Sequence, residues 1–184
     1  MEGDQYQVTE QRLSVADEQR PEVIEFFMYT CPHCYHLEPE VYDWLGAMAE
    51  SDSVNFIRIP AVFSARQKPL AAAFYAAEAL SLSDQLHPLL FEAIHEDGLN
   101  LSTEKAILDY VASQGVDRAS FAKMMSSFAV KAKVRKAEAL TNMSGISGVP
   151  SFVVNGRYHT SGPMAGSVPA IFEVVDFLVK KTQD

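Results

Sequence analysis

The first third of the chain alternates between short apolar runs and one amphipathic repeat. Residues 23–27 form an apolar run rich in strand-forming side chains, which is typical of a strand buried on both faces. Residues 54–59 form a second such run, followed by Pro60. Between them, apolar residues recur at helical spacing up to about Ala49: Leu37, Val41, Trp44, Leu45 and Met48. This pattern predicts a strand, a helix kinked at Pro39 and a second strand, with an edge strand at residues 5–9.

The middle of the chain, residues 62–139, has a different pattern. It is rich in Ala and Leu, shows no strand periodicity, and is interrupted by residues that favour turns or helix starts. Thr103 before Glu104, and Asp117 before Phe121, are typical of the first residues of helices. We therefore expect four or five short helices here.

Strand character returns near the C-terminus. Residues 151–154 are followed by Asn155-Gly156, the strongest signal for a two-residue hairpin, so residues 157–160 are expected to be the partner strand. A last helix is expected to have Ser167 as its N-cap and Pro169 in its first turn. Its apolar stripe would be formed by Ile171, Phe172, Val175, Leu178 and Val179.

The order of these elements is βαβ, a helical block, then ββα. This order resembles an α/β thioredoxin-like fold in which a helical domain is inserted between the two halves. Residues 1–61 and 140–184 would form the thioredoxin-like domain, and residues 62–139 the inserted domain. Architecture alone does not specify a function, because one fold supports many activities.

Composition and charge exclude several classes of protein. The chain has 184 residues, 48% of them hydrophobic and 21% charged, which is typical of a globular protein. The net charge of −9 argues against nucleic acid as a partner. No run reaches the ~20 apolar residues of a membrane span, and residues 1–5 show no signal-peptide pattern. The sequence is then that of either a cytosolic protein or a mature secreted form.

The two cysteines indicate redox chemistry. They stand in one motif, Cys31-Pro32-His33-Cys34, directly after the first buried strand. If Pro32 is the first helical residue, Cys31 is the N-cap, and its sulfur can accept from the N–H groups of His33 and Cys34. The helix dipole and a protonated His33 also favour an anion there, so the Cys31 pKa should be lowered. Cys34, one turn further on, would be the resolving thiol.

Zinc binding is the alternative reading of a C-x-x-C motif. A structural zinc site needs four ligands, and the chain has no second cysteine pair. His33 and His36 are too close in sequence to complete a relaxed tetrahedron with both cysteines. We therefore expect neither a metal nor another cofactor. His87, His95 and His159 are expected to be ordinary histidines.

The motif and its surroundings resemble the DsbA family of bacterial periplasmic dithiol oxidases. The similar residues are Glu25-Phe26-Phe27, Cys31-Pro32-His33-Cys34-Tyr35 and Gly148-Val149-Pro150-Ser151-Phe152. The resemblance implies a periplasmic monomer that oxidises unfolded secreted proteins with free cysteines, and a DsbB-like membrane quinone reductase that reoxidises it. It also implies a cis Val149–Pro150 bond facing the dithiol, where a client segment could pair with the Val149 backbone as an added strand.

Two charged residues are candidates for supporting roles. Glu25 is an acid inside an apolar strand, so burial should raise its pKa and allow it to exchange a proton with Cys34. Arg58, on the neighbouring predicted strand, matches a basic position of the family and could pair with Glu25. The alternative for Glu25 is a partly exposed strand end without a role.

Two other functions remain open from the sequence. The first is a disulfide reductase or isomerase on the same fold; for a reductase, the Cys31 pKa would lie near 7. The second, of a different class, is a metal-binding module that uses Cys31, His33 and Cys34.

Overall fold

The structure is a computed structural model that describes residues 3–13, 20–49 and 54–182. Backbone contacts divide the chain into two compact units: residues 1–59 with 140–184, and residues 60–139. The first unit contains a five-stranded sheet in the order β1-β5-β4-β2-β3. Its strands are β1 (Gln7–Val8), β2 (Glu22–Phe27), β3 (Asn55–Pro60), β4 (Ser151–Val154) and β5 (Tyr158–Ser161).

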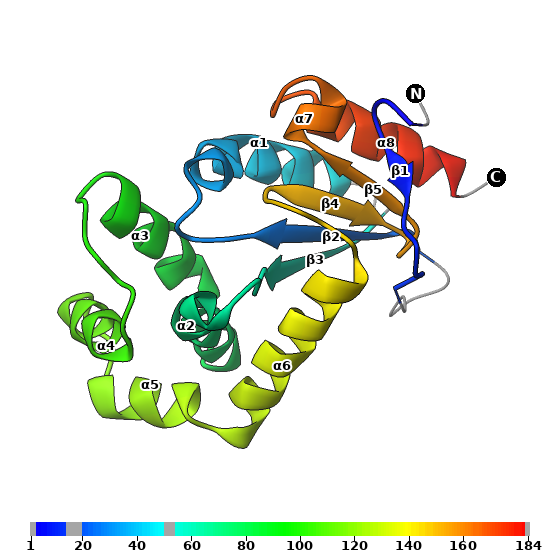
Figure 1. Ribbon diagram of the computed structural model, residues 1–184. Helices are drawn as coiled ribbons and strands as arrows, with labels where there is room; N and C mark the ends of the chain where they lie inside the picture. Colours follow the sequence, from blue (N-terminus) through cyan, green and yellow to red (C-terminus); the bar gives the residue numbers. More distant parts are fainter. Residues whose placement is uncertain (1–2, 14–19, 50–53, 183–184) are drawn as a thin grey trace. The chain divides into compact units, whose positions relative to one another are not determined.

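The predicted strands are present, with small differences in their bounds. β1 is an edge strand as predicted, but it is only two residues long. β3 includes Pro60 as its last residue instead of ending before it. β2 lies inside the sheet between β4 and β3, and all six of its residues are buried, which explains its continuous apolar pattern. β2 pairs antiparallel with β4, and β3 runs in the same direction as β2 (Figure 1).

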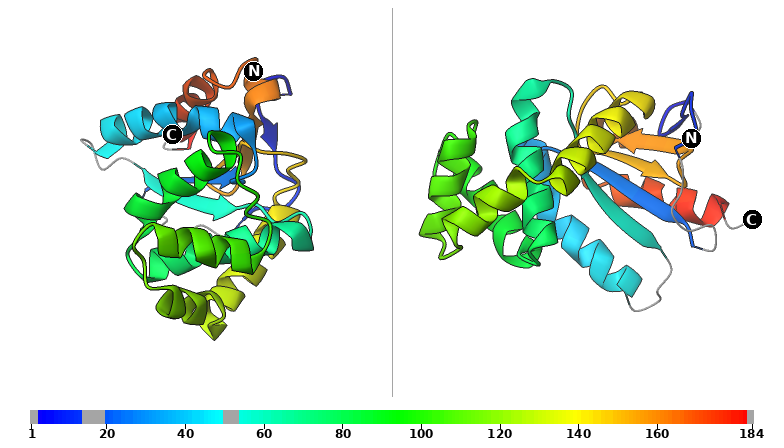
Figure 2. Two further views of the ribbon diagram at one scale, coloured as in Figure 1. Left: turned by 90° about the vertical axis from the view of Figure 1, so that its left-hand side faces the viewer. Right: turned by 90° about the horizontal axis from the view of Figure 1, so that it is seen from below.

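Two long helices cover one face of this sheet. They are α1 (Pro32–Ala49) and α8 (Ile171–Lys181), and both lie on the same side of the strands in each view (Figures 1 and 2). Trp44 of α1 stacks on Phe172 of α8 with ring centroids 5.2 Å apart, and its indole N–H donates to Asp176 at 2.8 Å. Phe152 of β4 packs edge-on against Phe172, so one apolar core joins both helices to the sheet.

The β4–β5 hairpin has one more loop residue than predicted. Asn155 and Gly156 both have positive φ, as the Asn-Gly signal predicts, but Val154 pairs with Tyr158, so Arg157 also belongs to the turn. The Leu13 N–H donates to the Gly156 carbonyl at 2.8 Å. A Cβ at position 156 would lie 2.1 Å from the Leu13 oxygen, so only glycine permits this approach.

The predicted start of the last helix was wrong. α8 begins at Ile171 with Ala170 at its N-cap, while Ser167 and Pro169 lie in the preceding turn. The Ser167 hydroxyl nevertheless accepts from the Ala170 N–H at 3.3 Å, so the capping signal was real but stabilises the turn before the helix. A short helix, α7 (Gly162–Ala165), precedes this turn and was not predicted. The predicted apolar stripe of α8 is buried, as expected.

The second unit is helical, as predicted. It contains the 3₁₀ helix η1 (Ala65–Gln67), α2 (Lys68–Ala79), α3 (Ser83–His95), α4 (Glu104–Ser113), α5 (Arg118–Met125) and most of α6 (Phe128–Met143). α2 contacts α3, α4 and α5, and is buried on most of its circumference. The predicted N-caps Thr103 and Asp117 each accept a hydrogen bond from the backbone N–H three residues on. Within the described residues, no helix has the length and apolar character of a membrane span.

Candidate active site at the start of helix α1

The start of α1 places Cys31 at the N-cap, as predicted. β2 ends at Phe27, and the Cys31 N–H donates to the Met28 carbonyl at 3.0 Å, which turns the chain from the strand into the helix. Pro32 is the first helical residue, where its missing N–H costs nothing. The Cys31 sulfur accepts from the Cys34 N–H at 3.4 Å. Cys31 is 8% exposed and Cys34 is fully buried, and both are free thiols.

The two sulfurs have opposite electrostatic environments. A hydrogen bond from the Cys34 thiol lowers the pKa of Cys31 to about 6, assisted by the backbone N–H groups of Cys34 and His33 and opposed by burial. Burial raises the pKa of Cys34 far above that of a free thiol, and the nearby Cys31 sulfur adds to this. The sequence predicted the lowered pKa of Cys31 but no pKa shift for Cys34. It attributed the stability of the Cys31 thiolate to the helix start and missed the larger contribution of the Cys34 thiol.

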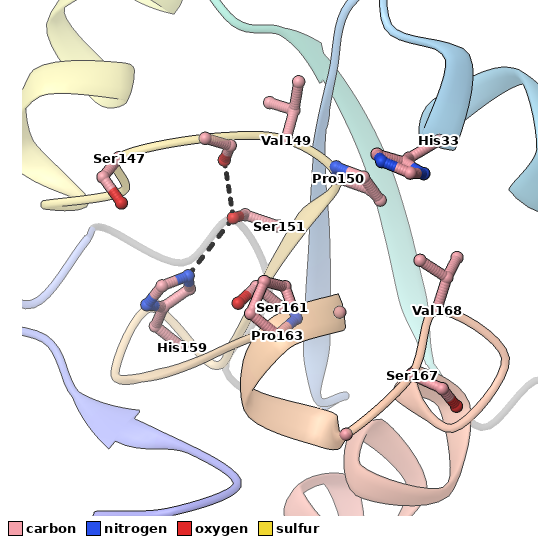
Figure 3. A pocket seen from close by; sticks show the side chains of 13 residues that line it. His33, Ser147, Val149, Pro150, Ser151, His159, Ser161, Pro163, Ser167 and Val168 are labelled. Atoms are coloured by element: carbon pink, nitrogen blue, oxygen red, sulfur yellow. Dashed lines mark hydrogen bonds between the residues drawn. The ribbon is translucent and has the colours of Figure 1, made fainter.

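The segment before β4 faces the dithiol. The Val149–Pro150 peptide bond is cis, as the family resemblance implied. The Cys31 thiol donates to the Val149 carbonyl at 3.4 Å, so a residue more than a hundred positions away contacts the first cysteine. Pro150 is buried and Val149 is partly exposed. His33 is exposed and lies beside Pro150 in the lining of the same hollow (Figure 3).

A buried charge cluster lies in the same unit of the chain. Arg58 on β3 approaches Glu25 on β2 with its Nε 3.2 Å from a carboxylate oxygen, which confirms the predicted pair. The guanidinium also donates from Nη1 to both oxygens of Glu38 on α1, at 3.0 and 2.9 Å. Sequence analysis missed Glu38, because nothing in its local pattern distinguishes it from an ordinary polar residue of a helix.

Glu25 is set to titrate near neutral pH. It is fully buried, and burial raises its pKa to about 7, against the opposing effect of Arg58 and with a small further rise from Glu38. The alternative of an exposed strand end is therefore wrong. The Glu25 charge also contributes to the raised pKa of Cys34. Glu25 and Cys34 therefore interact electrostatically, and the proton exchange between them stays a prediction.

A hollow of about 390 Å³ opens beside the dithiol (Figure 3). Its walls come from the start of α1, the segment before β4, β5 and the turn before α8. They carry one exposed imidazole, several hydroxyls and apolar side chains, namely His33, Ser147, Val149, Pro150, Ser151, His159, Ser161, Pro163, Ser167 and Val168. No carboxylate lines the hollow in the described part of the chain.

The structure also bears on the metal-binding alternative. Among residues 3–13, 20–49 and 54–182, no group of three or more His, Cys, Asp or Glu side chains is arranged to hold a metal ion. Cys34 is fully buried while His33 is exposed. Cys31, at 8% exposed, is thus the less buried of the two cysteines at the N-terminal end of α1.

Comparison with known proteins decides the family. The family model described as "DSBA-like thioredoxin domain" matches residues 45–172. The chain belongs to the DsbA family. It is 40% identical to the thiol:disulfide interchange protein DsbA of Burkholderia cepacia over 163 residues, which is 89% of this chain and 76% of that protein. It is 36% identical to DsbA of Azotobacter vinelandii over 179 residues, which is 97% of this chain and 83% of that protein.

Solved structures agree with this assignment. The crystal structure of Pseudomonas aeruginosa DsbA superposes with a TM-score of 0.92 and 32% identity, covering 100% of this chain and 94% of that one. This DsbA-family chain therefore has the thioredoxin-like α/β fold with inserted helices that the order of elements predicted. It is a thiol–disulfide oxidoreductase of the DsbA type.

Proposed function

We propose that the oxidised protein donates a Cys31–Cys34 disulfide to secreted proteins in the periplasm. The observation that carries this proposal is the contrast between the two thiols: the pKa of Cys31 is lowered to about 6, while that of Cys34 is raised. A sulfur that is stable as a thiolate favours the reduced protein, which makes its disulfide a good oxidant. Secretion of the chain is inferred from its family, which acts on secreted clients.

The reaction transfers two electrons from a client dithiol to the protein. A client thiolate attacks the Cys31 sulfur, so a client–Cys31 bond forms and the Cys31–Cys34 bond breaks. Cys34 leaves as a thiolate and takes up a proton; Glu25 is the proposed donor, because its pKa lies near 7 and its charge acts on Cys34. The second client thiolate then attacks the client sulfur of the mixed disulfide. The client disulfide forms, and Cys31 is released as a stable thiolate.

The remaining site residues support this exchange. Pro32 starts the helix that holds Cys31, and His33 contributes a backbone N–H and positive charge near the sulfur. Arg58 pairs with both Glu25 and Glu38 and so offsets part of their negative charge. The Val149 backbone, next to Pro150, would pair with an extended client segment. A DsbB-like membrane quinone reductase would return the protein to its disulfide form.

The test is the oxidation of a peptide with two cysteines by the oxidised protein. We expect one peptide disulfide per protein molecule, and none from Cys31→Ser. A glutathione redox equilibrium distinguishes an oxidase from a reductase or isomerase on the same fold. A Cys31–Cys34 disulfide that is not reduced by millimolar glutathione would contradict the oxidase assignment.

A further inference from the structure

The segment that carries the Val149 carbonyl lies outside regular structure. α6 ends at Met143 and β4 begins at Ser151, and the residues between them form turns and bends. In the described part of the chain, the Gly148 carbonyl has one hydrogen-bond partner, the Ser151 hydroxyl at 2.8 Å. Because Gly148 precedes Val149 directly, this bond restrains the peptide group next to the carbonyl that the Cys31 thiol contacts.

The Ser151 hydroxyl is itself held by an imidazole. Ser151 is 2% exposed, and its oxygen lies 3.3 Å from Nε2 of His159 (Figure 3). A hydroxyl has one proton, which Ser151 donates to Gly148, so its oxygen must accept from His159. Nε2 of His159 therefore carries a proton. Burial lowers the pKa of His159, so the ring is neutral at pH 7, with Nδ1 bare.

The register of the hairpin brings these residues together. Ser151 pairs with Ser161 and Val153 pairs with His159, so Ser151 and His159 are diagonal neighbours on one face of the sheet. Their bonds form one directed chain from the His159 N–H to the Ser151 hydroxyl to the Gly148 carbonyl. Successive hydrogen bonds of this kind polarise and strengthen one another. Both side chains line the hollow beside the dithiol.

We propose that Ser151 and His159 are positioning residues for client binding: they hold the peptide of Gly148 so that the Val149 backbone is aligned to pair with a client segment. This inference rests on the proposed function, in which the client pairs with Val149. Neither side chain reacts. Their effect should therefore appear with substrates that have a peptide backbone and vanish with a small thiol, because the small thiol reaches Cys31 without pairing.

The test compares two reductants of the oxidised protein: a peptide with two cysteines, and 2-mercaptoethanol. Loss of one buried hydrogen bond is worth about 1 kcal/mol, which is about a fivefold change. We expect Ser151→Ala to lower the second-order rate constant for oxidation of the peptide about fivefold, and to leave the rate constant for 2-mercaptoethanol and the Cys31 thiolate titration unchanged. His159→Leu should have the same effect, and His159→Gln, which retains an N–H donor, should restore most of the rate.

Ser144→Ala is the matched control. Ser144 is 3% exposed, and its hydroxyl donates to the Thr141 carbonyl at 2.9 Å, again three residues back, but it lies in no part of the site. It should reduce stability about as much as Ser151→Ala while leaving the peptide rate unchanged. Equal peptide rates for Ser151→Ala and the wild type, or equal losses with both reductants, would overturn the inference alone. A wild-type protein that fails to oxidise the peptide would overturn the proposed function as well.

Discussion

The stability of the reduced protein should depend on pH through Cys31. Its pKa is lowered to about 6, from 9.0 for an unperturbed thiol. The folded state therefore binds the Cys31 proton less tightly than the unfolded state. This contribution is complete above pH 9 and is lost as pH falls through 6.

The magnitude follows from the two pKa values. Three units correspond to about 4 kcal/mol when the contribution is complete. At pH 8 it is about 3 kcal/mol, at pH 7 about 1 kcal/mol, and at pH 5 close to zero. The oxidised protein has no Cys31 thiol, while its other groups titrate similarly. The free energy of unfolding of the reduced form, minus that of the oxidised form, should thus rise by about 3 kcal/mol from pH 5 to pH 8.

The assay is urea or thermal unfolding of both forms across this pH range, with a phosphine reductant in the reduced samples. For a chain of this size, the reduced form should gain roughly 5 to 10 °C in Tm relative to the oxidised form between pH 5 and pH 8. Cys31→Ser provides the control: it has no Cys31 thiol and cannot form the Cys31–Cys34 disulfide, so the pH dependence of its stability should match that of the oxidised protein. A difference that stays constant, or that shrinks as pH rises, would refute the link between the thiolate and the oxidising power.

Three further predictions concern other features of the site and the fold. Cys34→Ala should raise the Cys31 pKa, because it removes the hydrogen bond that stabilises the Cys31 thiolate most. Cys34→Ser keeps a hydroxyl donor there, so the Cys31 pKa should stay low; thiolate absorbance at 240 nm measures both. The raised pKa of Glu25 means that stability of the oxidised protein falls by about 3 kcal/mol as pH rises from below 4.5 to above 7; Glu25→Gln should remove this fall in urea unfolding. Gly156→Ala should destabilise the protein by several kcal/mol, because its Cβ would meet the Leu13 backbone. Gly46→Ala is the control: its Cβ meets no neighbour on the exposed side of α1, so it should stabilise the protein by about 1 kcal/mol. Equal Tm shifts for the two variants would contradict the close approach of Leu13 to the hairpin.

Local patterns predicted most of the fold. The buried β2, the stripe of α8 and the caps at Thr103 and Asp117 all follow from side-chain periodicity or from bonds that span three residues. The errors occurred where a residue typical of one element forms its hydrogen bond in a neighbouring element. The Ser167 hydroxyl forms a capping bond, but in a turn that precedes the helix, because the chain must first leave α7.

Sequence patterns predicted the part of the site whose residues lie together in one short motif. The Cys34 N–H donates a hydrogen bond to the Cys31 sulfur within a four-residue segment, so the spacing of the two cysteines alone specifies this geometry. Glu38 could not be found this way, because its role depends on Arg58, which lies on another strand. The Ser151–His159 bond depends on the hairpin register, which the Asn-Gly signal predicted one residue too short.

The pairing of β2 with β4 determines when this protein can acquire its reactivity. Val23 lies opposite Val154, and α1 packs through Val41 and Trp44 against side chains of β4 and α8. A chain emerging from its N-terminus exposes both cysteines long before these partners exist, and an isolated helix of this length is marginal in water. Until the last quarter of the chain has arrived, the two thiols behave as those of any unfolded polypeptide. The reactivity of a motif near the start of the sequence therefore depends on strands and a helix near its end.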